Sequence, residues 1–88
     1  MAEDQIRLDK WLFFTRAFKT RALAVQRIEA GGIRVNGQPC RKPGRALRPG
    51  DEVVISAHGA LRVLRVIAPG TRRGPADEAR LLYEEIDG

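Results

Sequence analysis

Residues 7–37, RLDKWLFFTRAFKTRALAVQRIEAGGIRVNG, decide the fold, because they predict two short helices joined by a basic turn and followed by a strand. Leu8, Trp11, Leu12 and Thr15 recur at the spacing of one helical face. The first helix should therefore bury its Leu/Trp side, with Trp11 in the core. Phe13 falls roughly opposite Leu8 and should lie off that face.

The second helix is predicted to begin after Thr20, whose hydroxyl can accept a hydrogen bond from a free N–H of the first turn. It should run to about Ala30 and stop at Gly31-Gly32, where one glycine can adopt the left-handed conformation. Residues 33–35 alternate as a strand does, and Asn36-Gly37 is a strong signal for a hairpin turn.

A return strand is expected around residues 38–41, and it should be brief because Pro39 and Pro43 lack the N–H donor that a ladder needs. Residues 42–48 are interpreted as an irregular basic loop that leads to a turn at 48–51. Strands are predicted at 52–56, with Val53 and Ile55 on one face, and at 61–67 after a turn at His58-Gly59. The imperfect alternation of 61–67 suggests a bulge or burial on both faces.

Residues 68–75, APGTRRGP, form a predicted linker, and 77–86 place Ala79, Leu82, Tyr83 and Ile86 at helical spacing. The fold class is therefore α+β: two N-terminal helices on a small, mostly antiparallel sheet of three to five strands, with a short C-terminal helix. The expected organisation is a flexible leader at 1–5, one domain at 6–67, and a linker with a helical segment at 68–88.

Composition narrows the class of protein. At 88 residues the chain has room for one domain. A single Cys40 and a single His58 provide neither an internal disulfide nor a zinc ligand set, and no apolar run approaches the length of a membrane span. We expect a cytoplasmic monomer without metal, cofactor or membrane contact. Cys40 is interpreted as a non-catalytic thiol.

Charge is distributed unevenly along the chain. The formal net charge is +5, yet residues 5–48 alone carry eleven Lys and Arg against two acids. The remainder is net negative. This asymmetry favours a face on the first half that binds a polyanion. The acid within it, Asp9, is expected to pair with a neighbouring arginine or to cap the first helix, because a carboxylate on such a face repels phosphate.

Four separated segments carry a resemblance to a known family: RLDKWL (7–12), KTRALA (19–24), GGIRVNG (31–37) and RPGDEVVI (48–55). In this order and spacing they resemble the S4 RNA-binding domain over residues 6–55. RLDKWLFFTRAFKTRALA (7–24) and RRGPADEARLLYEE (72–85) look most like the ribosome-associated heat shock protein 15 group, whose members continue into a basic extension. Arg27 and Gly44 depart from the pattern, which often has an apolar residue and a serine at these positions.

Arg16, Lys19 and Arg21 lie around the predicted start of the second helix, where guanidinium and ammonium groups, backbone N–H groups and the helix dipole can hold phosphate. Arg7 and Lys10 would extend this track along helix one. The resemblance adds the adjoining strand and turn. The candidate RNA-binding residues are Arg7, Lys10, Arg16, Lys19, Thr20, Arg21, Arg34, Asn36, Gly37 and Lys42.

The resemblance implies a non-enzymatic protein that binds ribosomal RNA or tRNA on the large ribosomal subunit, in rescue or recycling of stalled translation. The alternatives are the recognition module of a pseudouridine synthase or RNA methyltransferase, and a DNA-binding protein. The chain shows no glycine-rich cofactor loop after a strand and no nucleophile–histidine set. Phe13 and Tyr83 could stack on bases; packing of Phe13 on Leu82 or Tyr83, with Tyr83 as a docking anchor, is the favoured interpretation.

Overall fold

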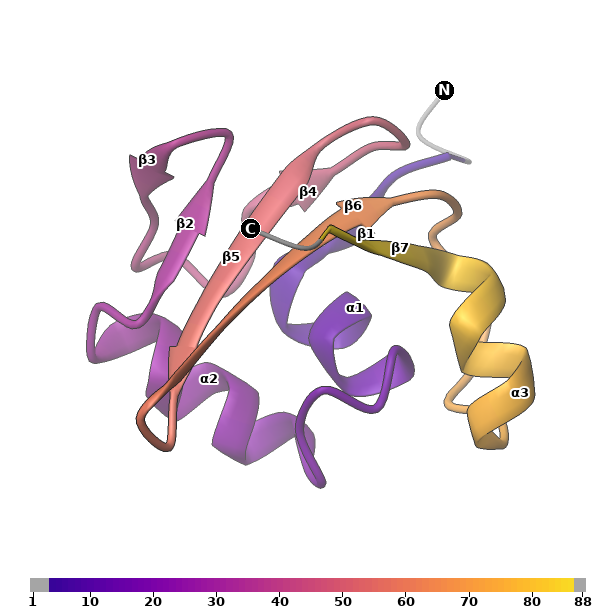
Figure 1. Ribbon diagram of the computed structural model, residues 1–88, viewed down its shortest axis with the longest axis horizontal. Helices are drawn as coiled ribbons and strands as arrows, with labels where there is room; N and C mark the ends of the chain where they lie inside the picture. The colour runs from indigo at the N-terminus through magenta and orange to yellow at the C-terminus, as the bar shows by residue number, and fades with distance from the viewer. Residues whose placement is uncertain (1–3, 87–88) are drawn as a thin grey trace.

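In the computed structural model, which describes residues 4–86, helices α1 (Leu8–Phe14) and α2 (Arg21–Glu29) pack on one face of a five-stranded antiparallel sheet (Figure 1). The strand order is β3-β2-β5-β6-β7. The strands are β2 (Ile33–Val35), β3 (Gln38–Pro39), β5 (Glu52–Ala57), β6 (Ala60–Val66) and β7 (Tyr83–Ile86). The predicted α+β class is confirmed. No helix among residues 4–86 is long and apolar enough to cross a bilayer.

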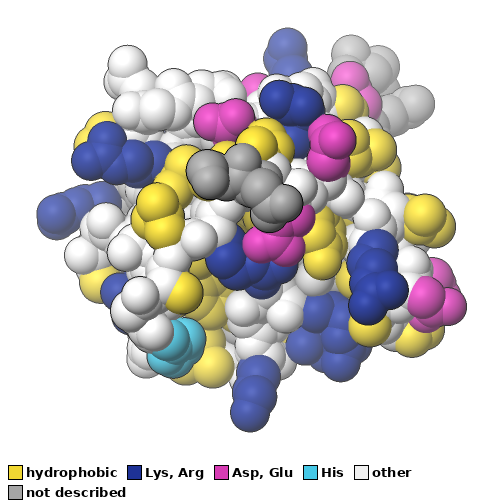
Figure 2. Space-filling model, viewed as in Figure 1, with side chains coloured by type: hydrophobic (Ala, Val, Ile, Leu, Met, Phe, Trp, Pro, Cys, Tyr) yellow, Lys and Arg dark blue, Asp and Glu magenta, His cyan; other side chains and the backbone are white. Residues whose placement is uncertain are grey.

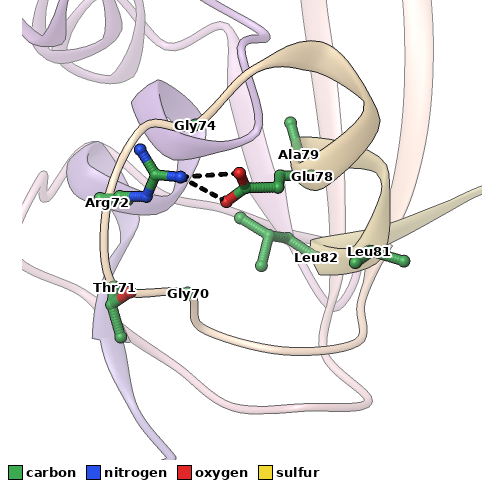
Figure 3. Close-up of a pocket in the computed structure, with 8 residues that line it drawn as sticks. All are labelled: Gly70, Thr71, Arg72, Gly74, Glu78, Ala79, Leu81 and Leu82. Carbon is green, nitrogen blue, oxygen red and sulfur yellow. Dashed lines mark hydrogen bonds and ion pairs between the residues drawn. The ribbon is translucent and has the colours of Figure 1, made fainter.

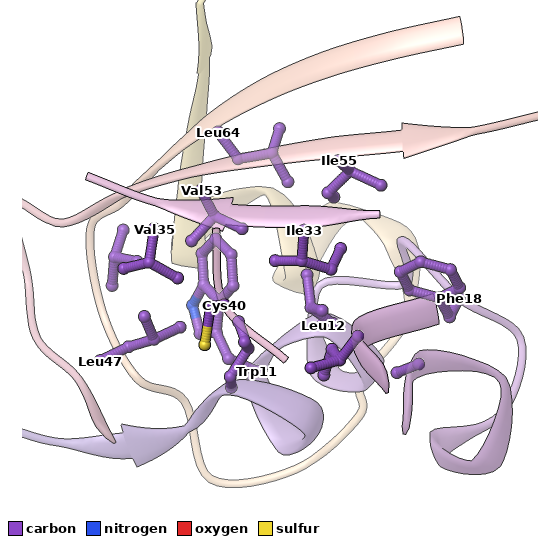
Figure 4. Packing of buried hydrophobic residues seen from close by; sticks show 14 residues of the cluster. Trp11, Leu12, Phe18, Ile33, Val35, Cys40, Leu47, Val53, Ile55 and Leu64 are labelled. Carbon is purple, nitrogen blue, oxygen red and sulfur yellow. The ribbon is translucent and has the colours of Figure 1, made fainter. Parts of the chain in front are cut away.

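The predicted helical face of α1 forms the centre of the core. Leu8, Trp11 and Leu12 are fully buried and Thr15 nearly so. They meet Ile33 and the inward side chains of β2, β5 and β6, as Figure 4 shows for Trp11, Leu12, Val53, Ile55 and Leu64. The indole Nε1 of Trp11 donates to the carbonyl oxygen of Ala68 at 3.1 Å, so its polar edge is satisfied within the core.

The turns follow the local sequence signals. Asn36 and Gly37 have φ of 52° and 81°, the paired left-handed conformation of a tight hairpin. β3 pairs with β2 through only two residues, as the prolines predict. His58 and Gly59 repeat this geometry between β5 and β6, with φ of 54° and 74°.

The register between β5 and β6 is continuous from Glu52↔Arg65 to Ala57↔Ala60, so the bulge considered for β6 is absent from this pairing. Leu64 and Val66 face the core. Burial on both faces is also wrong for the start of the strand, because Leu61 is 69% exposed. The imperfect alternation instead reflects apolar residues on the outer face of the sheet.

The predicted helix at 77–86 is wrong in its second half. The segment begins with α3 (Ala76–Ala79), tightens into a 3-10 turn η1 (Arg80–Leu82), and continues as strand β7, which pairs with β6 from Val66↔Tyr83 to Val63↔Ile86. Without β7 the edge of β6 would expose unpaired backbone groups. This requirement outweighs the helical spacing of Leu82, Tyr83 and Ile86.

The linker at 68–75 and α3 enclose a small hollow beside the Arg72–Glu78 pair (Figure 3).

Two residues of the expected basic loop also form a strand. β4 (Ala46–Leu47) pairs antiparallel with β1 (Ile6–Arg7), which places Arg7 immediately before α1 rather than on it. The pairing satisfies backbone groups at the entrance of the helix and buries Leu47. Most of the predicted leader, residues 1–3, lies outside the described residues.

Candidate nucleic-acid interface

A single carboxylate organises the start of α1. Asp9 is 2% exposed, and its Oδ1 accepts hydrogen bonds from Arg7 Nε at 3.1 Å and from the backbone N–H of Lys10 at 2.9 Å. Its Oδ2 accepts from Arg7 Nη2 at 3.2 Å and from Arg21 Nε at 3.1 Å. The predicted pairing of Asp9 with neighbouring arginines is confirmed. We refer to Arg7, Asp9 and Arg21 as the Asp9 cluster.

Two opposing effects set the charge state of this cluster. Burial acts to raise the pKa of Asp9, but the hydrogen bonds from Arg7 and Arg21 outweigh it, so the net pKa lies below its usual value. The hydrogen bond to Asp9 in turn raises the pKa of Arg7. Asp9 therefore keeps its negative charge at neutral pH and faces two guanidinium groups, so the cluster has one net positive charge.

The N-terminus of α2 lies beside this cluster. Thr20 Oγ1 accepts a hydrogen bond from the backbone N–H of Leu23 at 3.1 Å, which confirms the predicted cap. Lys19, Thr20 and Arg21 are all exposed. Because Arg21 is bonded to Asp9, its guanidinium is fixed between the start of α1 and the start of α2.

The basic loop after β3 closes over the same region. Its backbone accepts from α1: Leu8 N–H donates to the Arg45 carbonyl at 2.8 Å and Asp9 N–H to the Pro43 carbonyl at 3.1 Å. A Cβ on Gly44 would lie 3.7 Å from Arg7 Cζ, so the loop runs along the Arg7 guanidinium. We call the Asp9 cluster together with Lys10, Lys19 and Lys42 the cationic face. Arg45, in the same loop, is a neighbour that the sequence prediction left out although it belongs to the same basic run.

Arg16 is separated from this face. Its backbone has φ of 67°, and its Nη1 donates to the carbonyl oxygen of Gly74 at 3.0 Å, which directs the side chain toward the C-terminal linker. The structure therefore does not bring Arg16 together with Arg21. Arg16 and Arg21 are close in sequence but not in space, because the left-handed backbone at Arg16 reverses the direction of the chain after α1.

The three candidates on the hairpin have different surroundings. Arg34 is exposed and points away from the core, since Ile33 and Val35 on either side are buried. The Asn36 side chain is engaged in the fold: its Nδ2 donates to Asp51 Oδ1 at 3.1 Å and its Oδ1 accepts from Glu52 N–H at 2.9 Å. Gly37 is exposed at the turn.

The aromatic residues pack within the protein. The guanidinium of Arg73 lies 4.9 Å from the centroid of the Phe13 ring, and Arg73 Nε donates to the Phe13 carbonyl at 3.1 Å. Phe13 is thus covered by the C-terminal segment through Arg73, and its packing on Leu82 or Tyr83 stays a prediction. Tyr83 packs against the core, which confirms it as a docking anchor.

Arg27, one of the departures from the family pattern, and the thiol of Cys40 both pack against neighbouring residues. The methylene stem of Arg27 passes over Gly32, which leaves no room for a Cβ there. Cys40 is buried in the core, with its Sγ 3.6 Å from the Lys42 carbonyl oxygen. Within residues 4–86, no group of three or more His, Cys, Asp or Glu side chains is placed to bind a metal.

Comparison with known proteins gives a consistent group of relatives. Residues 6–53 match the family described as the S4 domain. The chain is 42% identical over 83 residues to a heat shock protein 15 homolog of Aeromonas salmonicida, and 42% identical over 81 residues to heat shock protein 15 of Escherichia coli K12. These alignments cover 94% and 92% of this chain but 62% and 60% of the relatives, so the chain spans about three fifths of their length.

A shorter relative is covered more completely. The RQC P-site tRNA stabilizing factor of Halalkalibacterium halodurans is 37% identical over 81 residues, which is 90% of this chain and 88% of that protein. Among solved structures, heat shock protein 15 of Vibrio cholerae, described as trimeric, matches with a TM-score of 0.87 and 33% identity over 93% of this chain and 82% of that one.

Proposed function

Because this chain belongs to the S4 domain family and is similar to the heat shock protein 15 group, we propose that it is a non-enzymatic RNA-binding protein of the cytoplasm. Its cationic face, with Arg34 and the Asn36-Gly37 turn beside it, contacts the RNA. The supporting observation is the Asp9 cluster, in which one buried carboxylate holds two arginines from separate elements at the surface.

The chemistry of this face suits a phosphate backbone. The Arg7 and Arg21 side chains are 53% and 43% exposed while their Nε atoms are bonded to Asp9, so each guanidinium is oriented yet keeps N–H donors for a ligand. Lys10, Lys19 and Lys42 add mobile positive charges. The hydrogen bonds within the Asp9 cluster reduce the side-chain entropy that the arginines lose on binding.

Structured RNA of the ribosome is the proposed partner, either ribosomal RNA of the large subunit or a bound tRNA, in the rescue or recycling of stalled translation. The name of the H. halodurans relative, a P-site tRNA stabilizing factor, supports a position near tRNA. Crosslinking in cells followed by sequencing of the bound RNA tests this assignment. Enrichment of one large-subunit or tRNA site supports it, and scattered RNA contradicts it.

The binding face itself is tested by removing charges that form no ion pair within residues 4–86. Lys10→Gln with Lys19→Gln should weaken binding to structured RNA and reduce the slope of log K against log salt by about 1.5, since each lost phosphate contact accounts for about 0.7 to 0.9. The thermal midpoint should be unchanged, because both side chains are exposed.

The matched control removes two cations from the other half of the chain, Arg65→Gln with Arg72→Gln, whose partners are the exposed Glu84 and Glu78. Equal weakening by both double variants would show that total charge, rather than the cationic face, determines affinity. A DNA duplex of the same sequence, measured in parallel, discriminates RNA recognition from general binding of duplexes. Sedimentation decides between the expected monomer and the trimer described for the V. cholerae protein.

A further inference from the structure

A hollow of about 230 Å³ lies at the opposite end of α1 from Asp9. It is enclosed by Thr15 and Arg16 after α1, by Arg62 on β6, and by residues of α3, η1 and β7. Figure 2 shows Lys and Arg side chains gathered on this side of the molecule, between the middle of the sheet and α3. Three arginines from separate elements, Arg16, Arg62 and Arg80, thus line one small concavity.

The backbone holds Arg16 toward this hollow. Residues other than glycine adopt φ near 67° at an energetic cost, which identifies the turn after α1 as a constrained position. The bond from Nη1 to the Gly74 carbonyl then fixes the side chain against the linker. A guanidinium has five N–H donors in one plane, so this single bond leaves donors for a ligand.

The charges around the hollow are not balanced. Arg62 forms a two-pronged pair with Glu85, at 2.8 and 2.9 Å. For Arg16 and Arg80 no ion pair is recorded within the described part of the chain, whereas Arg72, nearby in the linker, is paired with Glu78 at 2.7 Å. Of the three arginines that line the hollow, only Arg62 has an ion-pair partner among residues 4–86, so the lining carries excess positive charge that an anion entering the hollow would offset.

We propose that this hollow binds a phosphate group, with Arg16 and Arg80 as its charge partners and the Tyr83 hydroxyl as a further donor. Guanidinium groups bind phosphate through paired N–H donors, and groups converging from several elements match the several oxygens of a tetrahedral anion. The volume is below the range of about 300 to 1,000 Å³ typical of sites for whole small molecules, which suits one phosphate group of a larger ligand. The site is independent of the cationic face and of the RNA binding proposed for it.

Inorganic phosphate is the probe that tests the site directly. In an NMR titration of the complete chain at constant ionic strength, the Nε–H signals of Arg16 and Arg80 and the amide of Tyr83 should shift and saturate. Arg80→Gln should weaken the phosphate affinity by about fivefold or more. Arg72→Gln makes the same change of charge at a paired side chain outside the hollow and should leave the affinity unchanged.

A variant that is expected to strengthen phosphate binding controls for a general loss of structure. Glu85→Gln removes the carboxylate that pairs with Arg62, so phosphate should bind about two- to fivefold more tightly. Shifts that chloride reproduces at equal ionic strength, or an unchanged affinity in Arg80→Gln, would overturn the proposal.

Two further arms identify the source of the phosphate. If it belongs to an RNA backbone, structured RNA displaces inorganic phosphate from the hollow and Arg80→Gln also lowers RNA affinity. If it belongs to a free phosphate monoester, adenosine monophosphate produces the same shifts and Arg80→Gln leaves RNA affinity unchanged. Both results support the site, and because the first titration contains no RNA, its outcome is separate from that of the RNA-binding tests.

Discussion

Arg62, Arg65 and Arg72 in the C-terminal half each contact a glutamate of their own, whereas Arg7 and Arg21 in the N-terminal half share the single carboxylate of Asp9. One-to-one pairing neutralises these three cations where they stand. Sharing of the Asp9 carboxylate leaves the N-terminal half with excess positive charge. It also fixes the direction in which Arg7 and Arg21 point. The distribution of acids, more than the number of arginines, therefore separates the cationic face from the rest of the surface.

The largest expected effect comes from removing the shared carboxylate. Asp9→Ala leaves two arginines and the Lys10 N–H without their acceptor and should lower the free energy of unfolding by about 3 kcal/mol. Glu84→Ala and Glu78→Ala break exposed pairs and should each cost less than about 1 kcal/mol. Urea denaturation measures all three, and similar losses would show that the two halves use their acids alike.

Acidification should reveal the same difference. The pKa of Asp9 is lower in the folded protein than the value of about 3.9 in an unfolded chain, so its contribution to stability is complete above that pH and is lost as the pH falls through the folded value. The free energy of unfolding should thus fall below about pH 4, and less steeply in Asp9→Asn. The hydrogen bond from Arg62 also lowers the pKa of Glu85. The pH dependence of Glu85→Gln is therefore measured beside that of Asp9→Asn. Equal slopes in wild type and Asp9→Asn would contradict this assignment.

The junction between the halves depends on Gly70. Its φ is 78°, and a Cβ there would lie 2.9 Å from Leu82 Cδ1 and 3.5 Å from Phe14, at the point where the linker passes between the two halves. Gly70→Ala should lower the unfolding free energy by about 1 to 2 kcal/mol. Gly59→Ala has a similar φ of 74° but open space around it, and it isolates the cost of the backbone from that of packing. Thermal denaturation of the two variants should differ; identical midpoints would mean that the packing adds nothing.

Releasing the paired arginines should make the C-terminal half more like the N-terminal half. Glu84→Gln with Glu85→Gln frees Arg65 and Arg62, and on the proposed function it should raise affinity for random RNA about two- to fivefold at low salt. The gain should disappear at high salt, where surface charges are screened. Fluorescence anisotropy at two salt concentrations measures it, and a salt-independent gain would require another cause.

The smallest effect is expected at Gly44. A side chain there would make ordinary contact with Arg7 at 3.7 Å, and the position does not require the left-handed conformation. Gly44→Ser should change the free energy of unfolding by no more than about 0.5 kcal/mol and leave the cationic face intact. A larger loss in chemical denaturation would show that the loop cannot move from the Arg7 guanidinium.

Features determined by neighbouring residues were predictable from the sequence. The Thr20 cap, the Asn36-Gly37 turn and the buried stripe of α1 depend on local conformation and spacing, and all three are confirmed. The pairing of Asp9 was predictable as well, because an acid within a cationic segment has few other stable environments.

Features determined by contacts distant in sequence were not. Tyr83–Ile86 carries its two apolar residues at helical spacing, and only the open edge of β6 selects the strand. β4 is a strand because Ile6 and Arg7 lie across from it. Arg16 belongs sequentially to the basic turn, but its bond to Gly74, 58 residues away, places it elsewhere.

The hydrogen bond from Trp11 to Ala68 bears on how this architecture can be moved between proteins. The family match ends at residue 53, yet the central core residue of the matched stretch completes its bonding with a carbonyl group beyond it, and the same core contains Leu64 and Val66. The segment that must be transferred to keep the fold is therefore longer than the segment that the family match identifies. A graft of residues 6–53 alone would carry the cationic face without the scaffold that keeps it folded.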